Sequence, residues 1–210
     1  MRIAVIGLFV ASIASAEGRP PIGATATIDR VAARVNGKPI WRSDVEERVA
    51  TVVKATGEAA KPEAYTETLD ALIDQTVILS RADELHITTN DAEIDAAIDT
   101  VKKANQIDDK QLETALASQG LSRAQYRVEL GVQIRMQRTL YLELAPKLAI
   151  SEDDILKAYA QIKTAKPDAP AMDAKLHDEL KEQLTMKLFE SARDPWLKKR
   201  RLLAHVEKMP

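Results

Sequence analysis

The chain contains no cysteine, has few aromatic residues and shows no strong excess of either charge. Because none of its 210 residues is cysteine, a disulfide framework, thiolate metal sites, a cysteine nucleophile and a lipidated N-terminal cysteine are all excluded. The formal net charge of −2 argues against a protein built to neutralise a nucleic-acid backbone, which needs a basic surplus. The hydrophobic content of 45% suffices for a core, so the composition indicates a globular, mostly helical chain.

Glycine is also scarce, and its positions exclude the two common nucleotide-binding loops. No two glycines have the G-x-G spacing. Ala32 stands where a phosphate-binding loop ending at Gly37-Lys38 requires glycine. We therefore predict that the protein binds no nucleotide.

Patterns typical of catalytic or metal sites are missing as well. His86, His177 and His205 form no H-x-x-x-H or H-E-x-x-H pattern, and no G-x-S-x-G elbow is present. A single histidine could still act as a ligand or base, but a locally satisfied histidine is the more common case. The acidic runs Asp108-Asp109 and Glu152–Asp154 fall in the first turns of expected helices, where the helix dipole favours negative charge. We predict no catalytic residue, no metal and no cofactor.

The first 16 residues have the pattern of a secretory signal peptide. Arg2 precedes an apolar run from Ile3 to Ile13, and Ala14-Ser15-Ala16 matches the small-x-small cleavage pattern. The run is too short to span a bilayer as a helix, which needs around 20 residues. We predict cleavage near Ala16 and export, followed by a loose leader over 17–28. A buried N-terminal strand is the alternative interpretation.

Asn36-Gly37 stands between two short apolar runs and predicts a β-hairpin, because both residues tolerate the positive φ of a two-residue turn. Such a turn places Ile40 opposite Ala33. Pro39 cannot donate a ladder hydrogen bond, so the second strand is short or lies at an edge. A lone hairpin is marginal in water and needs a third strand or a helix.

From Ser43 onward, capping signals and apolar stripes predict helices. The expected capping boxes are Ser43/Glu46, Asn90/Glu93, Asp108/Gln111, Ser122/Gln125 and Ser151/Asp154. Apolar spacing indicates a long helix over about 63–84, and Gly120 ends a short helix near Leu112–Leu121. A further helix is expected over 151–164.

Residues 126–137 fit two periodicities. Apolar residues alternate with polar ones, as in a strand, but they also form two rows of i, i+4 spacing. We interpret the segment as a helix, because the cap at Ser122 precedes it and Arg, Gln, Glu and Leu dominate its composition. Two apolar rows predict a helix that is contacted on two sides, at the centre of a bundle.

A linker at 165–171 precedes a long amphipathic helix with apolar residues at every fourth position from Met172 to Ala192. We expect Asp194-Pro195 to break this helix and to start a new turn. The basic run Lys198–Arg201 has a structural explanation at a helix C-terminus, with an acidic binding surface as the alternative. The tail 202–207 alternates and is a candidate third strand for the hairpin.

These patterns predict a mainly α fold: a multi-helix bundle with a short N-terminal β-hairpin joined by a C-terminal strand. The expected organisation is a signal peptide (1–16), a leader (17–28), a helical core (29–164), a linker (165–171) and a C-terminal helix and strand (172–210) that pack back on the core. No segment after the signal peptide is apolar enough to span a membrane.

The order of these features resembles the SurA-type periplasmic chaperones. In that family a hairpin carrying V-A-x-V-N leads through S-D-V into the first helix, as Asp29–Gly37 and Ile40–Val45 do here. Further similar segments are Leu69–Gln75, His86–Ile94, Tyr126-Arg127 with Ile134-Arg135, and Trp196–Arg201 with Ala204-His205-Val206. The likeness extends from about 29 to 207 and depends on order and spacing, since no single motif is unique.

The chain departs from this family in one respect. Many members carry one or two parvulin-type isomerase domains before the final helix, whereas only residues 165–171 occupy that place here, too few for a folded domain. The resemblance therefore implies a chaperone core without the isomerase, and not an enzyme.

The function implied is that of an ATP-independent periplasmic holdase, which binds unfolded outer-membrane polypeptides in an apolar groove between helices. We expect no nucleic-acid partner. The candidate peptide-binding residues, all on the helix with two apolar rows, are Tyr126, Leu130, Ile134, Met136, Leu140 and Tyr141. Two alternatives remain: a peptidyl-prolyl isomerase with a degenerate domain, and a periplasmic adaptor with one fixed partner.

Overall fold

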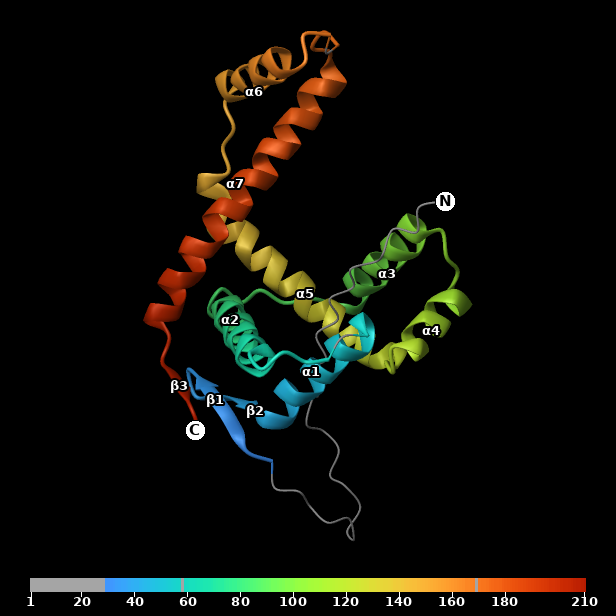
Figure 1. The fold of residues 1–210 in the computed structure, drawn as a ribbon, viewed down its shortest axis with the longest axis vertical. Coiled ribbons are helices and arrows are strands. Elements are labelled where there is room, and N and C mark those ends of the chain that lie inside the picture. The colour runs from blue at the N-terminus through green and yellow to red at the C-terminus, as the bar shows by residue number, and fades with distance from the viewer. Residues whose placement is uncertain (1–28, 58, 169) are drawn as a thin grey trace. The chain divides into compact units, whose positions relative to one another are not determined.

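The computed structural model describes residues 29–57, 59–168 and 170–210, so the expected signal peptide and leader lie outside the described residues. The strands are β1 (Val31–Val35), β2 (Lys38–Trp41) and β3 (Val206–Lys208). The helices are α1 (Arg42–Thr56), α2 (Ala64–Glu84), α3 (Asp91–Asn105), α4 (Asp109–Ser118), α5 (Arg123–Leu144), the short 3-10 helix η1 (Ala145–Lys147), α6 (Glu152–Ala165) and α7 (Ala174–Leu203) (Figure 1). The expected mainly α fold with a small antiparallel sheet is confirmed.

The chain divides into two compact units. Unit 1 contains the described residues up to Thr139 together with Leu203–Pro210, and unit 2 contains Leu140–Leu202. The division falls within α5 and at the end of α7, and not at the 165–171 segment.

The sheet of unit 1 has the order β2-β1-β3, with β1 at its centre and both neighbours antiparallel to it. Asn36 and Gly37 have φ values of 51° and 81°, as a two-residue hairpin turn requires. The predicted register is confirmed, since Ile40 pairs with Ala33. Ala33, Val35 and Ile40 are buried, so one face of the hairpin belongs to the core.

The C-terminal strand completes this sheet. The backbone N–H of Asn36 donates to the His205 carbonyl at 2.9 Å, and the His205 N–H donates to the Asn36 side-chain oxygen at 2.9 Å. Lys208 forms an ion pair with Asp70 of α2 at 2.8 Å. The predicted third strand is confirmed, but it begins at Val206, because residues 202 and 203 still belong to α7.

The predicted capping box at Ser43 is wrong. Helix α1 begins at Arg42, and the Ser43 hydroxyl donates to the Asp29 carboxylate instead of capping the helix. Asp44 accepts from the Trp41 N–H at 3.3 Å, and Glu46 pairs with Arg42 at 2.8 Å. Because α1 follows β2 directly, the N-cap position falls at Trp41, and Ser43 already lies inside the helix.

The other four capping boxes are confirmed. In each, the cap side chain accepts from the N–H three residues later, and the later side chain accepts from the N–H of the cap. The pairs are Asn90/Glu93, Asp108/Gln111, Ser122/Gln125 and Ser151/Asp154. The helical interpretation of 126–137 is also confirmed, because these residues lie within α5.

Helices α3, α4 and α5 enclose an apolar cluster in unit 1. Its buried members are Ile98, Leu112, Leu116, Leu121 and Tyr126, and Ile94, Ile107 and Leu130 pack against it. Gly131 of α5 sits close to α3: a Cβ at this position would lie 3.3 Å from the Ile94 side chain. The absence of a side chain at Gly131 therefore permits this close helix contact.

Charged side chains connect α5 to α2 and to the loop that follows it. Arg135 pairs with Asp83 and donates to the Ile87 carbonyl at 3.0 Å, and Arg138 donates to the Thr88 carbonyl at 2.8 Å. The Lys38 ammonium and the Arg135 guanidinium together hold the pKa of the Asp83 carboxyl below its usual range. The two arginines thus provide donors for the Ile87 and Thr88 carbonyls, which lie between α2 and α3.

In unit 2 the segment after α6 runs back along that helix before α7 begins. The Lys163 ammonium donates to the Pro167 carbonyl at 3.3 Å, and the Tyr159 hydroxyl donates to the Pro170 carbonyl at 2.9 Å. The expected linker is thus held against α6 by side-chain hydrogen bonds. Among the described residues, no helix is both long and apolar enough to cross a membrane.

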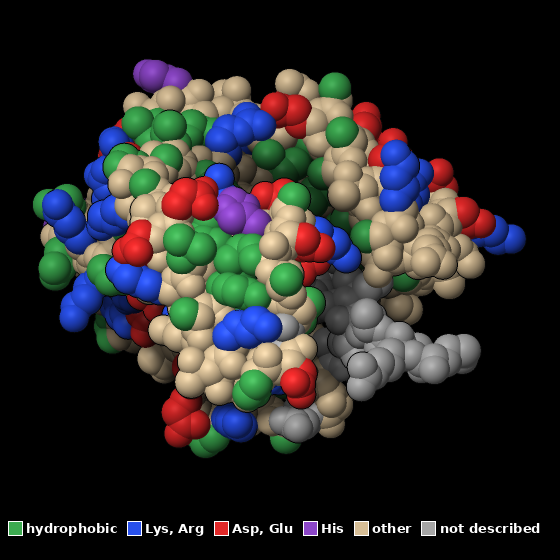
Figure 2. Space-filling view, turned by 90° about the horizontal axis from the view of Figure 1, so that it is seen from above, with side chains coloured by type: hydrophobic (Ala, Val, Ile, Leu, Met, Phe, Trp, Pro, Cys, Tyr) green, Lys and Arg blue, Asp and Glu red, His purple; other side chains and the backbone are tan. Residues whose placement is uncertain are grey.

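The predicted helix break at Asp194-Pro195 is wrong, because α7 is continuous and contains Pro195. An interior proline removes one backbone hydrogen bond and costs about 3 kcal/mol. Trp196, the next residue, is buried and hydrogen-bonded within unit 2, and removing a buried tryptophan side chain costs about 3–5 kcal/mol. Burial of Trp196 therefore offsets the cost of the proline, which the local pattern could not reveal. On the face drawn in Figure 2, apolar side chains are mixed with charged ones of both signs.

Two leucines on the last turn of α5 provide a test of this packing. Leu144 is fully buried, whereas Leu142 is 56% exposed. We expect Leu144→Ala to lower the free energy of unfolding by about 2–5 kcal/mol, because it removes buried methyl groups and leaves a cavity. Urea unfolding followed by circular dichroism measures the change. Leu142→Ala is the matched control and is expected to change stability little; equal losses in the two variants would contradict the packing described.

Candidate functional site

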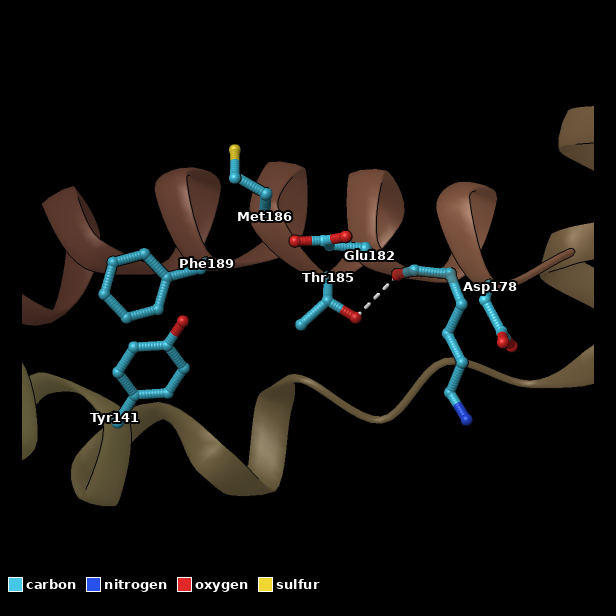
Figure 3. Close-up of a pocket in the computed structure, with 7 residues that line it drawn as sticks. Tyr141, Asp178, Glu182, Thr185, Met186 and Phe189 are labelled. Atoms are coloured by element: carbon cyan, nitrogen blue, oxygen red, sulfur yellow. Dashed lines mark hydrogen bonds between the residues drawn. The ribbon is translucent and has the colours of Figure 1, made fainter. Parts of the chain in front are cut away.

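An open pocket of about 390 Å³ lies between the end of α5 and α7, within unit 2 (Figure 3). Tyr141 lines it from α5 and Phe189 from α7, with ring centroids 5.0 Å apart and ring planes inclined by 30°. Such tilted aromatic pairs are attractive beyond the area that they bury. Tyr141 is nevertheless 49% exposed and Met186, which also lines the pocket, is 59% exposed. The pocket therefore presents apolar surface to solvent, and we call it the Tyr141–Phe189 pocket.

Three charged side chains and one threonine form the remainder of its lining. Asp178, Lys181 and Glu182 all come from α7. The Thr185 hydroxyl donates to the Lys181 carbonyl at 2.8 Å, as Figure 3 shows, so its methyl group is left for apolar contact. An apolar surface with charges of both signs beside it suits a mixed polypeptide segment better than a single ion.

A shared carboxylate holds the end of α5 against α7. The Trp196 indole N–H and the Arg200 guanidinium both donate to Glu143 Oε2, each at 2.9 Å. The Arg200 guanidinium carbon also lies 5.8 Å from the Trp196 ring centroid, within cation–π range. Phe189 and Trp196 are seven residues apart and therefore share a face of α7. The same contact that fixes α5 thus holds Tyr141 beside Phe189.

A histidine connects the pocket to α6. His177 Nε2 lies 3.0 Å from Glu152 Oε2 on the first turn of α6, and His177 Nδ1 lies 3.3 Å from Asp178 Oδ1. The hydrogen bond to Glu152, followed by that to Asp178, raises the pKa of His177 above its usual value. Because Asp178 lines the pocket, this clamp links the pocket to the position of α6.

Unit 1 has a groove of its own, of about 350 Å³, between α1 and α2. Its lining is mostly small and aliphatic: Val49, Val52, Val53, Ala59, Ala60, Ala64 and Ala71. Arg48, Lys61 and Glu67 add charge. The groove has no aromatic side chain in its lining, which distinguishes it from the Tyr141–Phe189 pocket.

Buried charge lies close to this groove. Burial lowers the pKa of Arg48, and the negative charge of Glu129, which is only 3% exposed, acts in the opposite direction. Burial also raises the pKa of Tyr126, and the Glu129 charge adds to that effect. The negative charge of Glu129 therefore offsets part of the cost of burying the Arg48 guanidinium, and burial remains the larger effect.

The six residues predicted to bind peptide have different surroundings. Tyr126 and Leu140 are buried, at 3% and 8% exposure, and Leu130 packs against the α3–α5 cluster. Ile134 and Met136 are partly buried. Tyr141 is the one of the six that lines the Tyr141–Phe189 pocket. The structure therefore does not bring the six together in one exposed groove.

Sequence reasoning missed Phe189 and Met186. Met186 lies on α7 but off the apolar stripe that contains Leu184 and Leu188, whereas Phe189 shares a face with Trp196 and is half-buried. A large apolar residue outside the buried stripe of an amphipathic helix is expected to be exposed. The position of Met186 outside the stripe was therefore the signal in the sequence that could have indicated this pocket. In the described ranges, no group of three or more His, Asp or Glu side chains is arranged to hold a metal ion.

Comparisons with known proteins point to one family. The model of the SurA-like N-terminal domain matches residues 2–140. Chaperone SurA of Shewanella oneidensis is 26% identical over 154 residues, which are 70% of this chain and 35% of that protein. Chaperone SurA of Saccharophagus degradans is 29% identical over 150 residues, 69% of this chain and 33% of that protein. The chain thus spans about a third of the length of the curated relatives it matches.

A solved structure is also similar. It belongs to work on PEB4 and the periplasmic protein Cj1289 of Campylobacter jejuni, described as two structurally related SurA-like chaperones. The TM-score is 0.58 at 14% identity, and the match covers 86% of this chain and 99% of the other. This similarity shows that the two chains share a fold.

The His177 clamp predicts a pH-dependent stability. Because the clamp raises the pKa of His177, protonated His177 stabilises the fold below its unfolded pKa of about 6.5, and this contribution is lost as pH rises through the folded value. We expect His177→Gln to lower the urea midpoint more at about pH 6 than at about pH 9.

Glu152→Gln serves as the partner variant. In its background, His177→Gln is expected to cost less at about pH 6, because the principal hydrogen-bond partner of His177 is already weakened. A loss of the same size at both pH values would contradict the clamp.

Proposed function

The chain belongs to the SurA-like N-terminal domain family, and on that premise we propose that it is a holdase chaperone that binds unfolded polypeptides in the Tyr141–Phe189 pocket. One observation carries this proposal. Of the nine large apolar side chains that are exposed among the described residues, Tyr141 and Met186 both line this one pocket, where they lie beside the half-buried Phe189.

The chemistry of this pocket suits varied clients. Met186 has an unbranched, polarisable side chain that adapts to different apolar partners, and Tyr141 offers a flat ring. The charged groups Asp178, Lys181 and Glu182 give polar backbone and side chains of a client places to bind. Weak contacts of this kind favour release as well as capture.

No nucleotide is needed for such an activity. A protein that binds the unfolded form lowers its free concentration by mass action alone. The lack of a nucleotide-binding loop in the sequence supports an ATP-independent holdase. The N-terminal pattern at 1–16 supports export, and the similar solved structure comes from work on PEB4 and the periplasmic protein Cj1289. We propose that the activity takes place in the periplasm, and the family resemblance suggests outer-membrane polypeptides as the clients.

The pocket lies outside the family match, which ends at residue 140. The proposal therefore depends on this chain's own residues at 141–189 in addition to the family. The relatives are about twice as long, so any activity of their remaining parts, such as the proline isomerisation that the family resemblance suggests, is not carried over. The protein is expected to leave the uncatalysed cis–trans exchange rate of a proline peptide unchanged.

The proposal predicts that the protein suppresses light scattering when a urea-unfolded β-barrel protein is diluted into buffer. The variant Tyr141→Ser/Met186→Ser removes apolar surface at two exposed positions and is expected to bind the client about fivefold more weakly. The loss is measured as the higher chaperone concentration that is needed for half-maximal suppression.

Leu142→Ser is the matched control, because Leu142 is adjacent to Tyr141 and 56% exposed but does not line the pocket. It is expected to retain wild-type suppression. No suppression by the wild-type protein at several-fold molar excess would refute the holdase. Capture of one stoichiometric partner from an envelope extract, instead of a mixed set of barrel proteins, would favour a fixed adaptor.

A further inference from the structure

The last turns of α7 in unit 2 combine a basic surface with an isolated exposed leucine. Residues 193–202 contain five basic residues and one acidic residue, in a chain whose overall charge is −2. Leu202 is 80% exposed, the highest value among the large apolar side chains that the structure describes. None of these basic residues lines the Tyr141–Phe189 pocket, and neither does Leu202.

The two faces of this helix segment have different roles. Trp196 and Arg200 are one turn apart and both donate to Glu143, so they form the inward face. Lys198, Lys199 and Leu202 are spaced three and four residues apart and therefore share another face, where all three are exposed. Within the described part of the chain, neither lysine has a hydrogen bond or ion pair. The inward face anchors the helix, and the other face presents two lysines, without ion-pair partners among the described residues, beside an exposed leucine.

From this arrangement we propose that the face formed by Lys198, Lys199 and Leu202 docks on an anionic phospholipid surface. The lysine ammonium groups bind lipid phosphates, and the Leu202 side chain enters the boundary between headgroups and acyl chains. Each Lys or Arg near an anionic membrane adds a modest attraction that salt screens, so the contact is reversible and weakens as salt rises.

The size of the surface favours a membrane over a protein partner. A specific protein interface buries at least about 1,000 Å² in total, whereas this face is little more than one helix turn. A lipid surface requires no matching pocket, because mobile headgroups move to the cations. The proposal is separate from client binding, since its residues lie outside the Tyr141–Phe189 pocket.

Co-sedimentation with lipid vesicles tests the proposal. The wild-type chain is expected to bind vesicles that contain phosphatidylglycerol more than vesicles of phosphatidylcholine alone, and to dissociate between about 50 mM and about 300 mM salt. Lys198→Glu/Lys199→Glu is expected to lower the affinity for anionic vesicles about tenfold or more. Leu202→Ser is expected to lower it about threefold.

Matched variants complete the design. Lys175→Glu/Lys187→Glu makes the same change in net charge at two exposed lysines of the same helix, and Leu156→Ser removes another exposed leucine of unit 2. Both are expected to bind vesicles as the wild type does. All the proteins share the same N-terminal segment, so any membrane affinity of its apolar run is common to them. Equal vesicle binding by Lys198→Glu/Lys199→Glu and its charge-matched control would overturn the proposal, as would equal wild-type binding to both vesicle types.

The outcome is distinguishable from that of the holdase test. Lys198→Glu/Lys199→Glu is expected to suppress aggregation of the unfolded client as the wild type does, because the pocket is intact. Loss of vesicle binding with retained suppression supports the membrane surface. Loss of both activities together with the circular dichroism signal of the helices would show that α7 itself needs these lysines, and would overturn the surface role.

Discussion

The rest of the structure depends on the pairing of β1 with both a neighbouring and a distant strand. A hairpin alone is marginal in water, and here the C-terminal strand completes the sheet. Asn36 serves both pairings, because it forms the turn and exchanges two hydrogen bonds with His205. Every residue between these positions therefore belongs to a loop whose two ends are held at the sheet. Unit 2 is part of that loop and is connected to unit 1 at each of its ends.

Unit 2 shows how a chain can leave apolar surface exposed without losing its order. Its buried apolar residues are few: Leu140, Leu144, Ile155, Leu180 and Trp196. Polar contacts supplement this small core, notably the carboxylate of Glu143, which accepts from two side chains of α7. Directional bonds fix the helices without covering them, so the aromatic pair and the basic face remain accessible. A larger core would have buried the same surfaces.

Local signals in the sequence predicted most of the elements, and their failures have a common cause. The Asn-Gly turn and four capping boxes depend on residues within a few positions of each other, so nearby sequence is sufficient to predict them. Ser43 and Pro195 were misread because distant residues decide their state. Asp29 engages the Ser43 hydroxyl, and the contact of Trp196 with Glu143 sustains the helix through the proline.

The sequence by itself determined the helix stripes, the hairpin register and the family resemblance, because each follows from spacing along one chain. It also led to the prediction that no nucleotide is bound, since the common nucleotide-binding motifs need residues that are not there. Only the tertiary structure decided which apolar residues are core and which are surface. Tyr126 and Tyr141 come from one helix and look alike in sequence, yet one is buried and the other lines a pocket. Burial depends on what packs against a side chain, and that partner comes from distant parts of the chain.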